Sequence, residues 1–550
     1  MRRLRALVCV FGVALIAAGA WTAAQPKARK NKRAKKKLVD RQYKKFGRPL
    51  MTKIASGEID AAIRDAEQVL VQLPGDCEAL YFLAIAQAQK GRVDEAVATA
   101  KKALAGGLAI GRFLAGPRTV ARPLLESKAF QALAAKHAVR LVHGPMVGAV
   151  THERARFWVR TAAEMPVAVV LTQSGAPGPP IRSAVVNTKA DRDFTAMVEL
   201  AGLQPATQYD VAVHVGGKPV ALEAKPSFRT FPKPGAKGRF QVAFGGGAGY
   251  TPQHERMWNT LAGHKLTAFL TLGDNVYIDT PEVPETQRYC YYRRQSRPEW
   301  RRFVASTPVF SIWDDHDFGT NDCKGSPGID DVPWKVPVWN VFRENWVNPS
   351  YGSGDKQPGV WYDFTIGDVD FIMLDCRFYR VLGTKGKDDD SGTMLGPVQK
   401  KWLLGRLARA KGTFKVLASS VPWSKGTKGG SRDTWDGFNQ EREEILSFLA
   451  ENRVEGVFLI SADRHRSDAY KTERPNAYPL YEASSSRLTN VHTHGIIKHS
   501  LFGYNEKCSF GLLTFDTARA DPELTYQVVN IDDEVIHTLK IKRSELSFTE

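Results

Sequence analysis

The pattern of apolar and polar residues changes twice along the chain. Residues 41–138 have a helical pattern, with an alanine-rich stretch at 79–88. From about residue 139, short runs rich in β-branched and aromatic residues, such as 155–159 and 167–171, predict the strands of a β-sandwich that ends near 235. From 238 to 550, apolar strand-like runs alternate with helical stretches, and this alternation predicts an α/β layered domain.

Four apolar runs of this last segment end in polar clusters. The runs at 268–272, 310–313, 371–374 and 457–460 lead into Gly273-Asp274, Asp314-Asp315-His316, Asp375-Cys376-Arg377 and Ser461-Ala462-Asp463. Open α/β sheets bind ligands at the carboxyl ends of their strands. We therefore expect these carboxylates to converge on one rim of a sheet.

Such a carboxylate cluster requires a compensating positive charge, because several buried acids cannot all ionise without one. Metal ions supply that charge, and carboxylate and tyrosinate oxygens are hard ligands. Two metals about 3.5–4 Å apart would hold a phosphate and convert a bound water to hydroxide. An N-cap or turn role is the simpler interpretation for any single aspartate. Several aspartates together with His316 and His465 favour a metal site.

The helical segment contains an internal repeat. Residues 56–62 (SGEIDAA) align with residues 90–96 (KGRVDEA). The period of this repeat, about 34 residues, resembles that of the tetratricopeptide helix-turn-helix unit. One and a half to two copies are too few for a long solenoid, so two roles stay open: a groove that binds a protein partner, or a helical spacer.

The N-terminus has the pattern of an export signal. Arg2, Arg3 and Arg5 precede an apolar run that ends at Trp21 and is followed by small residues, which predicts a signal peptide over 1–24. An uncleaved anchor is the alternative, although the run is short for a membrane span of about 20 residues. Residues 25–40 then form a basic linker. Its stretch 27–37 is either simply solvated or attaches to an anionic lipid or wall polymer.

Composition excludes several classes of protein. Hydrophobic residues make up 43% of the chain and charged residues 25%, which is ordinary for a globular protein and excludes a mostly disordered chain or a polytopic membrane protein. The net charge is +19, but residues 1–37 hold 11 Lys and Arg and no acid, which leaves 66 basic against 58 acidic residues. Specific nucleic-acid binding is therefore not expected. The scattered cysteines give no zinc-ligand spacing, and Cys290 with Cys323 is the candidate disulfide pair.

Several motifs resemble the PhoD-like phosphatases of the calcineurin-like metallophosphoesterase superfamily. The matching blocks occur in the family's order at 273–277 (GDNVY), 313–317 (WDDHD), 374–380 (LDCRFYR), 433–438 (DTWDGF) and 461–465 (SADRH). The resemblance implies an α/β metallophosphoesterase sandwich of two sheets flanked by helices, preceded by a fibronectin-type β-sandwich. The expected organisation is a signal peptide (1–24), basic linker (25–40), tetratricopeptide-like helical domain (41–138), fibronectin-type β-sandwich (139–235) and catalytic domain (238–550).

The resemblance also implies a ligand set for two metals. Asp274 would bridge both ions. Tyr277 and His465 would complete the first site, which the family suggests is ferric iron (Fe3+), and Asp315 and Asp463 would hold the second, suggested to be calcium (Ca2+).

Three further residues take catalytic roles by the same resemblance. His316 would lie beside the leaving-group oxygen, as a general acid or as a phosphate-binding donor. Arg377 and Arg464 are candidates to neutralise phosphate oxygens through paired hydrogen bonds. A structural salt bridge is the alternative for each arginine. His492 and His494 are either part of the pocket wall or ordinary loop or strand histidines.

The sequence departs from the family pattern at two positions. Gly247 stands where PhoD-like enzymes place a cysteine ligand, and Ser420 stands where the wider superfamily has a ligand histidine before a proline. His254 or Glu255 is a candidate substitute ligand. The glycines at 245–247 lack the Gly-Lys-Ser/Thr sequence of a phosphate-binding P-loop, and predict a tight turn close to the site.

These observations together predict an exported enzyme that hydrolyses phosphate mono- or diesters by attack of a metal-bound hydroxide, without a phosphoenzyme. It would be periplasmic, secreted or on the cell surface. The alternative is a cell-surface binding protein with a catalytically weak phosphatase-like domain, which the glycine at 247 and the helical repeat both motivate. A nuclease is less favoured because the body of the chain is only mildly basic.

Overall fold

The computed structural model describes residues 43–175, 178–384, 391–429 and 431–549. The predicted signal peptide (1–24) and basic linker (25–40) lie outside the described residues. The described residues all belong to one compact unit. Among the described helices, none combines the length and the apolar character that a membrane crossing needs.

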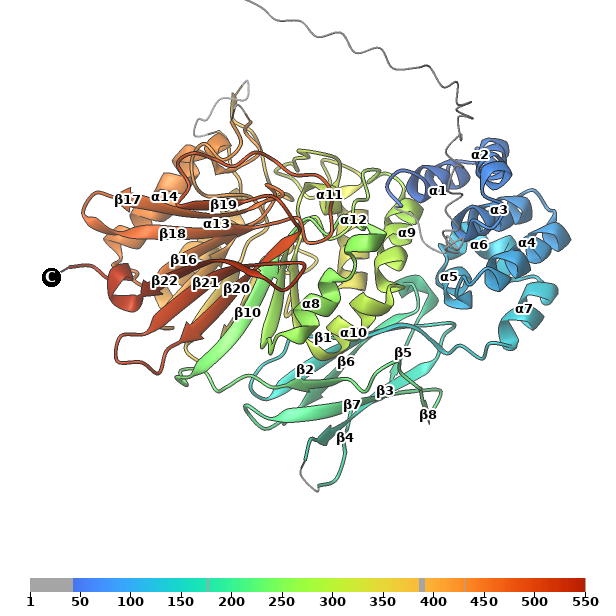
Figure 1. Ribbon diagram of the computed structural model, residues 1–550, viewed down its shortest axis with the longest axis horizontal. Coiled ribbons are helices and arrows are strands. Elements are labelled where there is room, and N and C mark those ends of the chain that lie inside the picture. The colour runs from blue at the N-terminus through green and yellow to red at the C-terminus, as the bar shows by residue number, and fades with distance from the viewer. Residues whose placement is uncertain (1–42, 176–177, 385–390, 430, 550) are drawn as a thin grey trace, which may run out of the picture. The chain divides into compact units, whose positions relative to one another are not determined.

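The described chain opens with a helical segment. Its helices are α1 (Gly47–Ala55), α2 (Ile59–Gln72), α3 (Cys77–Gln89), α4 (Val93–Ala105), α5 (Ile110–Ala115), α6 (Arg118–Leu125) and α7 (Lys128–Ala135) (Figure 1). The repeat in the sequence appears here as two matching helix starts, since α2 and α4 begin at equivalent positions of its two copies. Gly57 and Gly91, which precede these helices, both have positive φ (81° and 77°), a backbone conformation that glycine adopts without a Cβ clash.

The next segment, up to Arg229, is a β-structure with two sheets. One holds β1 (Leu141–Gly148), β2 (Arg154–Thr161) and β6 (Thr195–Ala201). The other holds β3 (Pro166–Gln173), β4 (Ile181–Arg182), β5 (Val186–Asn187), β7 (Gln208–Val215), β8 (Lys218–Pro219) and β9 (Ser227–Arg229), and a 3-10 turn, η1, covers Ala190–Arg192.

The predicted boundaries imply that both sheets lie within residues 139–235, but the first sheet extends beyond them. β1 pairs in parallel with β12 (Val309–Ile312) through Gly148 and Val309, so β1, β2 and β6 extend a sheet of the C-terminal segment. Glycine allows this close approach, because a Cβ at Gly148 would lie 2.7 Å from the Val309 carbonyl oxygen. The β-structure is therefore joined to the C-terminal segment by backbone pairing.

The extended sheet has nine strands, in the order β22-β21-β20-β10-β11-β12-β1-β2-β6. Its other strands are β10 (Arg239–Gly245), β11 (Ala268–Leu272), β20 (Ser509–Asp516), β21 (Glu523–Asn530) and β22 (Val535–Lys542). β10, β11 and β12 run parallel to one another. The helices and turns associated with this half are α8 (Met257–Gly263), α9 (Pro284–Gln295), α10 (Pro298–Ser306), α11 (Asp315–Phe318), α12 (Lys335–Asn345) and η2 (Pro252–His254).

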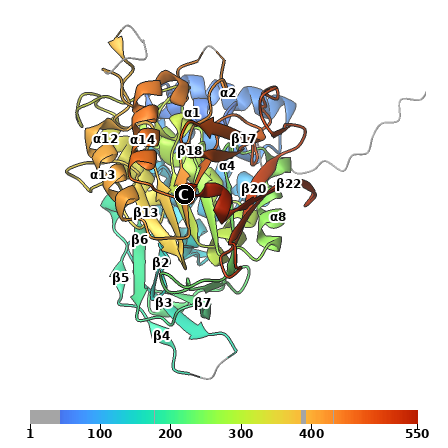
Figure 2. The ribbon, with the colours of Figure 1, turned by 90° about the vertical axis from the view of Figure 1, so that its left-hand side faces the viewer.

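A second sheet of seven strands has the order β13-β14-β15-β16-β18-β17-β19. Its strands are β13 (Tyr362–Ile366), β14 (Val369–Met373), β15 (Phe414–Ala418), β16 (Val457–Ser461), β17 (Ser467–Arg474), β18 (Ala477–Ser485) and β19 (Phe502–Tyr504). Helices α13 (Gly396–Arg409) and α14 (Asn439–Glu451) flank it (Figure 2), and 3-10 turns lie at η4 (Trp435–Gly437) and η5 (Arg543–Leu546).

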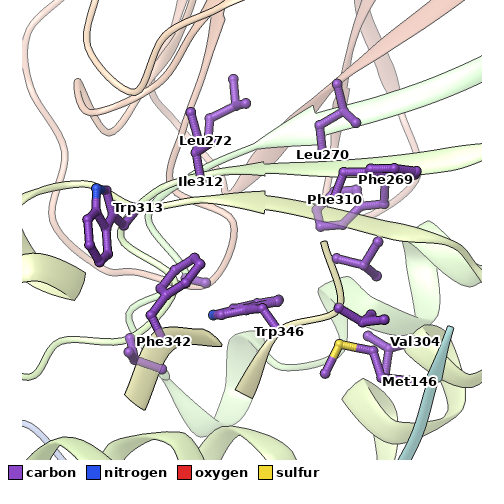
Figure 3. Close-up of a cluster of buried hydrophobic side chains, with 14 of the residues drawn as sticks. Met146, Phe269, Leu270, Leu272, Val304, Phe310, Ile312, Trp313, Phe342 and Trp346 are labelled. Carbon is purple, nitrogen blue, oxygen red and sulfur yellow. The ribbon is translucent and has the colours of Figure 1, made fainter. Parts of the chain in front are cut away.

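Aromatic side chains pack the two sheets face to face. The rings of Phe310 from β12 and Phe364 from β13 stack with centroids 3.9 Å apart, and Phe371 from β14 meets Phe515 from β20 at 5.8 Å. On the opposite face of the nine-stranded sheet, side chains of β11 and β12 pack against residues of α10 and α12 such as Val304 and Phe342 (Figure 3). This arrangement is the expected α/β sandwich of two sheets flanked by helices.

The strands predicted from apolar runs are confirmed, but their carboxyl ends do not share one sheet. β11 and β12 belong to the nine-stranded sheet, whereas β14 and β16 belong to the seven-stranded sheet. The two sheets meet at these ends through a parallel bridge between Gly246 and Ser486. The polar clusters therefore converge on an edge formed by two facing sheets.

The predicted disulfide between Cys290 and Cys323 is wrong. Both are free thiols, as are the other three cysteines of the described residues. Cys290 is buried in α9, where its Sγ lies 3.6 Å from the Tyr277 carbonyl oxygen.

Candidate metal centre

A cavity of about 370 Å³ opens at the edge where the two sheets meet. It is lined by all five predicted metal ligands (Asp274, Tyr277, Asp315, Asp463 and His465), by the predicted catalytic residues His316 and Arg464, and by Lys44, Asp279, Asn321, Asp322, Lys428, Asn490, His492 and His494. A larger hollow of about 1070 Å³ lies between the β-structure and helices α9 and α12, but it contains none of the predicted site residues. The tertiary structure thus gathers residues that are spread along the sequence from Lys44 to His494.

The backbone at the cavity is held in conformations that side chains rarely adopt. Asp274, Asp463 and His465 all have positive φ, at 54°, 62° and 49°. Gly273 also has positive φ (103°), and a Cβ there would lie 2.4 Å from the Asp314 Cβ, so no larger residue fits between the ends of β11 and β12. Such strain concentrates at functional sites, where the surrounding structure enforces it.

Asp274 lies at the centre of the candidate ligand set. Ligand atoms of Asp274, Asp315 and His316 lie within 4.8 Å of one another. The Tyr277 hydroxyl donates to Asp274 Oδ2 at 2.7 Å, and His465 Nε2 lies 3.9 Å from the same oxygen. Asp274 Oδ1 is buried and has no hydrogen-bond partner among the described residues. A buried acceptor without a partner is costly, and a bound cation would remove that cost.

The pKa values of the buried carboxyl groups around Asp274 indicate a shortage of compensating positive charge. Burial raises the pKa of Asp274 to about 6 and that of Asp315 to about 7, and each carboxylate raises the pKa further in its neighbours. Burial also raises the pKa values of Asp314 and Asp317 to about 7. Burial alone would lower the pKa of His316, but the carboxylates of Asp274, Asp279 and Asp315 outweigh it and raise that pKa to about 10. This unbalanced negative charge fits a metal ion.

His465 has the protonation state and the free nitrogen that a metal ligand needs. Burial and the neighbouring His492 and His494 lower its pKa well below the usual value, which keeps the imidazole neutral. Its Nδ1 is buried and has no partner among the described side chains. A Cβ at Gly247 would lie 3.0 Å from this Nδ1, so a side chain at position 247 would enter the space beside His465.

The glycine turn has the close-approach role that the sequence predicts. Gly247 has φ of 68°, and a Cβ there would lie 2.8 Å from the Arg487 backbone nitrogen. At Gly246, a Cβ would lie 2.7 Å from the Ala462 Cβ. The turn thus allows the end of β10 to pass directly against the segment that carries Asp463 and His465.

Neither candidate substitute for the family cysteine lines the cavity formed by the described residues. His254 Nδ1 lies 3.4 Å from Cys508 Sγ. Glu255 pairs with Arg294 and accepts a hydrogen bond from the Trp258 indole at 2.8 Å. These contacts give both residues structural partners away from the cavity.

The two predicted arginines occupy different positions. Arg377 is fully buried and does not belong to the cavity lining; its guanidinium contacts Asp314 and Asp433, each at 2.6 Å. Arg464 lines the cavity, where its Nη1 lies 3.2 Å from Asp463 Oδ2. The geometry therefore offers only Arg464 of the two for direct contact with a ligand in the cavity. Ser420, at the other departure from the superfamily pattern, donates to Asp314 Oδ1 at 2.7 Å.

His492 and His494 are part of the pocket wall. Their ring centroids lie 5.2 and 5.8 Å from that of His465. They lie on a loop after β18 and not on a strand. Burial lowers the pKa of both histidines.

Sequence reasoning missed several residues of the site. Asp279 pairs with His316 Nδ1, the Asn490 amide donates to the Tyr277 hydroxyl at 2.8 Å, and Lys428 Nζ contacts Asp322 at 2.7 Å. Asp279 closely follows the 273–277 block, and this proximity is a signal that could have identified it. Lys44 lies far upstream of every motif and carries no such signal.

Comparison with known proteins gives two family matches. The PhoD-like phosphatase model matches residues 242–527, and a domain of unknown function, DUF7800, matches residues 138–233. Alkaline phosphatase D of Bacillus subtilis strain 168 is 25% identical over 351 residues, which cover 56% of this chain and 58% of that protein. The chain thus matches less than two thirds of the length of this relative.

Two solved structures share the fold. A structure of PhoD superposes with a TM-score of 0.59 at 20% identity, covering 72% of this chain and 88% of the other. Purple acid phosphatase PPD1 from yellow lupin (Lupinus luteus) gives a TM-score of 0.53 at 12% identity, covering 73% and 75%. The family model spans just over half of the residues and contains every predicted metal ligand. The chain therefore belongs to the PhoD-like phosphatase family.

Proposed function

We propose that this protein hydrolyses phosphate esters in the 370 Å³ cavity where the two sheets meet. The observation that carries the proposal is the convergence of Asp274, Asp315 and His316, with an Asp274 oxygen left buried and without a partner among the described residues. Membership of the PhoD-like phosphatase family supports the reaction class.

The donor set fits hard metal ions. Asp274, Tyr277 and His465 would hold one ion, and Asp315 and Asp463 with Asp274 would hold the second. Carboxylate and phenolate oxygens with one neutral imidazole suit ferric iron and calcium, the ions that the family resemblance suggests. When bound, two such ions supply Lewis acidity, which lowers the pKa of water and neutralises charge on a phosphate.

The protein's own residues would orient the substrate and donate a proton. Asp279 holds His316 through Nδ1, which directs Nε2 to donate a proton to the leaving-group oxygen. Arg464 would contact phosphate oxygens, and Arg377 would act through Asp314, which it fixes by an ion pair. The cavity wall formed by the described residues contains no serine, threonine or cysteine nucleophile, and Asp274, Asp315 and Asp463 would be engaged by metal, which favours direct attack by water without a phosphoenzyme.

The proposal also covers export and the segments that precede the PhoD-like region. The helical segment would be tetratricopeptide-like and the β-structure fibronectin-type. Export through residues 1–24 would place the enzyme in the periplasm, on the cell surface or outside the cell. Amino-terminal sequencing of the protein recovered from outside the cytoplasm tests export. A mature chain that begins near residue 25 supports it, and recovery of the full-length chain from the cytoplasm alone contradicts it.

The first test is hydrolysis of bis-p-nitrophenyl phosphate by purified residues 25–550, with and without a chelator and with iron and calcium restored. We expect turnover that the chelator abolishes and the ions restore. The Asp463→Asn variant should lose turnover and keep its fold by circular dichroism. No turnover under any metal condition would contradict the proposal and favour the alternative, a surface binding protein on a phosphatase scaffold.

A further inference from the structure

The cavity includes one basic side chain from outside both matched family regions. Lys44 lies just before α1, whereas the family models cover residues 138–233 and 242–527. Its Nζ lies 3.2 Å from the centroid of the Tyr277 ring. The helical segment therefore reaches the catalytic cavity and does not lie apart from it.

Lys44 differs from the other two basic residues of the cavity in its ion pairing. Lys428 lies 2.7 Å from Asp322 and 2.9 Å from Asp433, and Arg464 lies 3.2 Å from Asp463. Among the described residues, no carboxylate forms a direct ion pair with Lys44 Nζ. Burial lowers the pKa of Lys44 to about 8, while the carboxylates of Asp274 and Asp279 favour its charged form. At neutral pH its ammonium group is thus a cation at the cavity wall whose charge no direct ion pair neutralises.

The residues on both sides of Lys44 contact the loop that carries Tyr277. On one side of it, the Tyr43 hydroxyl accepts a hydrogen bond from the Tyr277 backbone nitrogen at 2.9 Å. On the other side, Arg48 donates to the Tyr277 carbonyl oxygen at 2.8 Å and pairs with Asp279, the partner of His316. These contacts bracket Lys44 and hold it beside the metal ligand Tyr277.

Helix α1 packs closely against α9, and the two helices are neighbours in Figure 1. A Cβ at Gly47 would lie 1.8 Å from the Tyr289 hydroxyl oxygen, so only glycine fits there. The Thr52 and Thr286 hydroxyls lie 3.0 Å apart, and Glu78 of α3 pairs with Arg293 of α9 at 2.9 Å. Docking of the helical segment is therefore specific, and it determines where Lys44 lies.

We infer that Lys44 binds a phosphate oxygen of the substrate, so that the helical segment completes the active site. The inference rests on the proposed phosphoesterase function and adds a substrate contact to it. Lysine binds phosphate as a point charge, and a phosphomonoester dianion carries more negative charge than a diester monoanion. Lys44 therefore favours monoesters over diesters, and it also binds the product, inorganic phosphate.

The test compares Lys44→Met with the matched control Lys45→Met, whose side chain is exposed on the neighbouring position. For p-nitrophenyl phosphate, KM should rise about tenfold in Lys44→Met, the effect of losing one charge-assisted hydrogen bond. For bis-p-nitrophenyl phosphate the rise should be smaller, and the inhibition constant of inorganic phosphate should rise with the monoester KM. Lys44→Arg should restore most of the loss, and Lys45→Met should match the wild type.

Two results would overturn the inference. Unchanged KM and phosphate inhibition in Lys44→Met would show that the ammonium group does not contact phosphate. An equal loss on both substrates, not restored by Lys44→Arg, would show that Lys44 only supports the Tyr277 loop. If the wild type hydrolyses neither substrate, the proposed function fails, and calorimetric titration with inorganic phosphate still tests Lys44. Equal affinity in the wild type and in Lys44→Met would then refute the contact.

Discussion

Two buried clusters of charge in this protein have opposite electrostatic balance. In the helical segment, Glu78 is fully buried between Arg112 at 2.8 Å and Arg293 at 2.9 Å. Burial opposes its ionisation, but the two guanidinium groups outweigh burial and lower the pKa of Glu78 to about 2. At the cavity, burial raises the pKa values of Asp274 and Asp315 to about 6 and 7, and the carboxylates that lie beside one another there add to the rise.

The difference separates a structural ion cluster from a ligand site. The carboxylate of Glu78 is neutralised by two arginines of the same chain, so this cluster needs no added ion. Its ion pairs link α3 to α5 and α9. Among the described residues, Asp274 and Asp315 of the cavity form no ion pair with a lysine or an arginine, and they gain stability when a cation binds. Mutations should therefore have opposite effects on the stability of the metal-free protein in the two clusters.

The largest expected effect is on activity and comes from Asp274→Asn. Loss of this carboxylate, which we propose to bridge the two metal ions, should lower kcat/KM by about 10³-fold, since metal ions stabilise the transition state by several kcal/mol. The thermal midpoint of the metal-free protein should stay the same or rise, because a mutually repelling charge is removed. Steady-state kinetics and calorimetry measure both quantities. Asp516→Asn, at the end of β20 and outside the cavity lining, is the control, and equal activity of the two variants would refute the role of Asp274.

Glu78→Gln should act on stability instead. Removing one partner of a buried ion cluster leaves uncompensated charge and costs about 3–5 kcal/mol. Urea unfolding should show this loss, whereas Glu67→Gln, on the exposed face of α2, should change stability by less than about 0.5 kcal/mol. A Glu78→Gln variant as stable as the wild type would remove the contrast between the two clusters.

The pH dependence of stability sharpens this contrast. Because the pKa of Glu78 is lowered on folding, its contribution is fully present above the unfolded pKa of about 4.3 and is lost as pH falls toward 2. The stability difference between the wild type and Glu78→Gln should therefore be constant from about pH 5 to 7 and shrink below pH 4. Unfolding curves across this range measure it, and a difference independent of pH would contradict the assignment.

A smaller effect is expected at the turn beside His465. Gly247→Ala should lower stability by about 1–3 kcal/mol, since the residue has positive φ and its Cβ would meet His465 and Arg487. Gly235→Ala is the matched control, because Gly235 also has positive φ (79°) but has no neighbour within 4 Å of the added Cβ. The difference between the two variants measures crowding beside His465. Equal losses would show that the space beside Nδ1 accepts a side chain.

Much of the candidate site is visible in the sequence because its proposed ligands follow the ends of buried strands. Asp274, Asp315 and Asp463 each come shortly after an apolar run, and Tyr277 and His465 complete short motifs around them. These spacings reflect local geometry, in which a strand ends and its next residues turn toward the ligand. The same local logic identified the helical repeat, whose two copies supply the starts of α2 and α4.

Contacts between distant segments could not be found in this way. The sequence by itself determined the strands, the helical repeat and the ligand motifs, because hydrophobic periodicity and turn chemistry act over a few residues. Only the tertiary structure decided that the strand ends come from two facing sheets, that β1 joins β12, and that Arg377 is buried in ion pairs while Lys44 reaches the cavity. Burial and charge balance decide these roles, and both depend on which distant segments pack together.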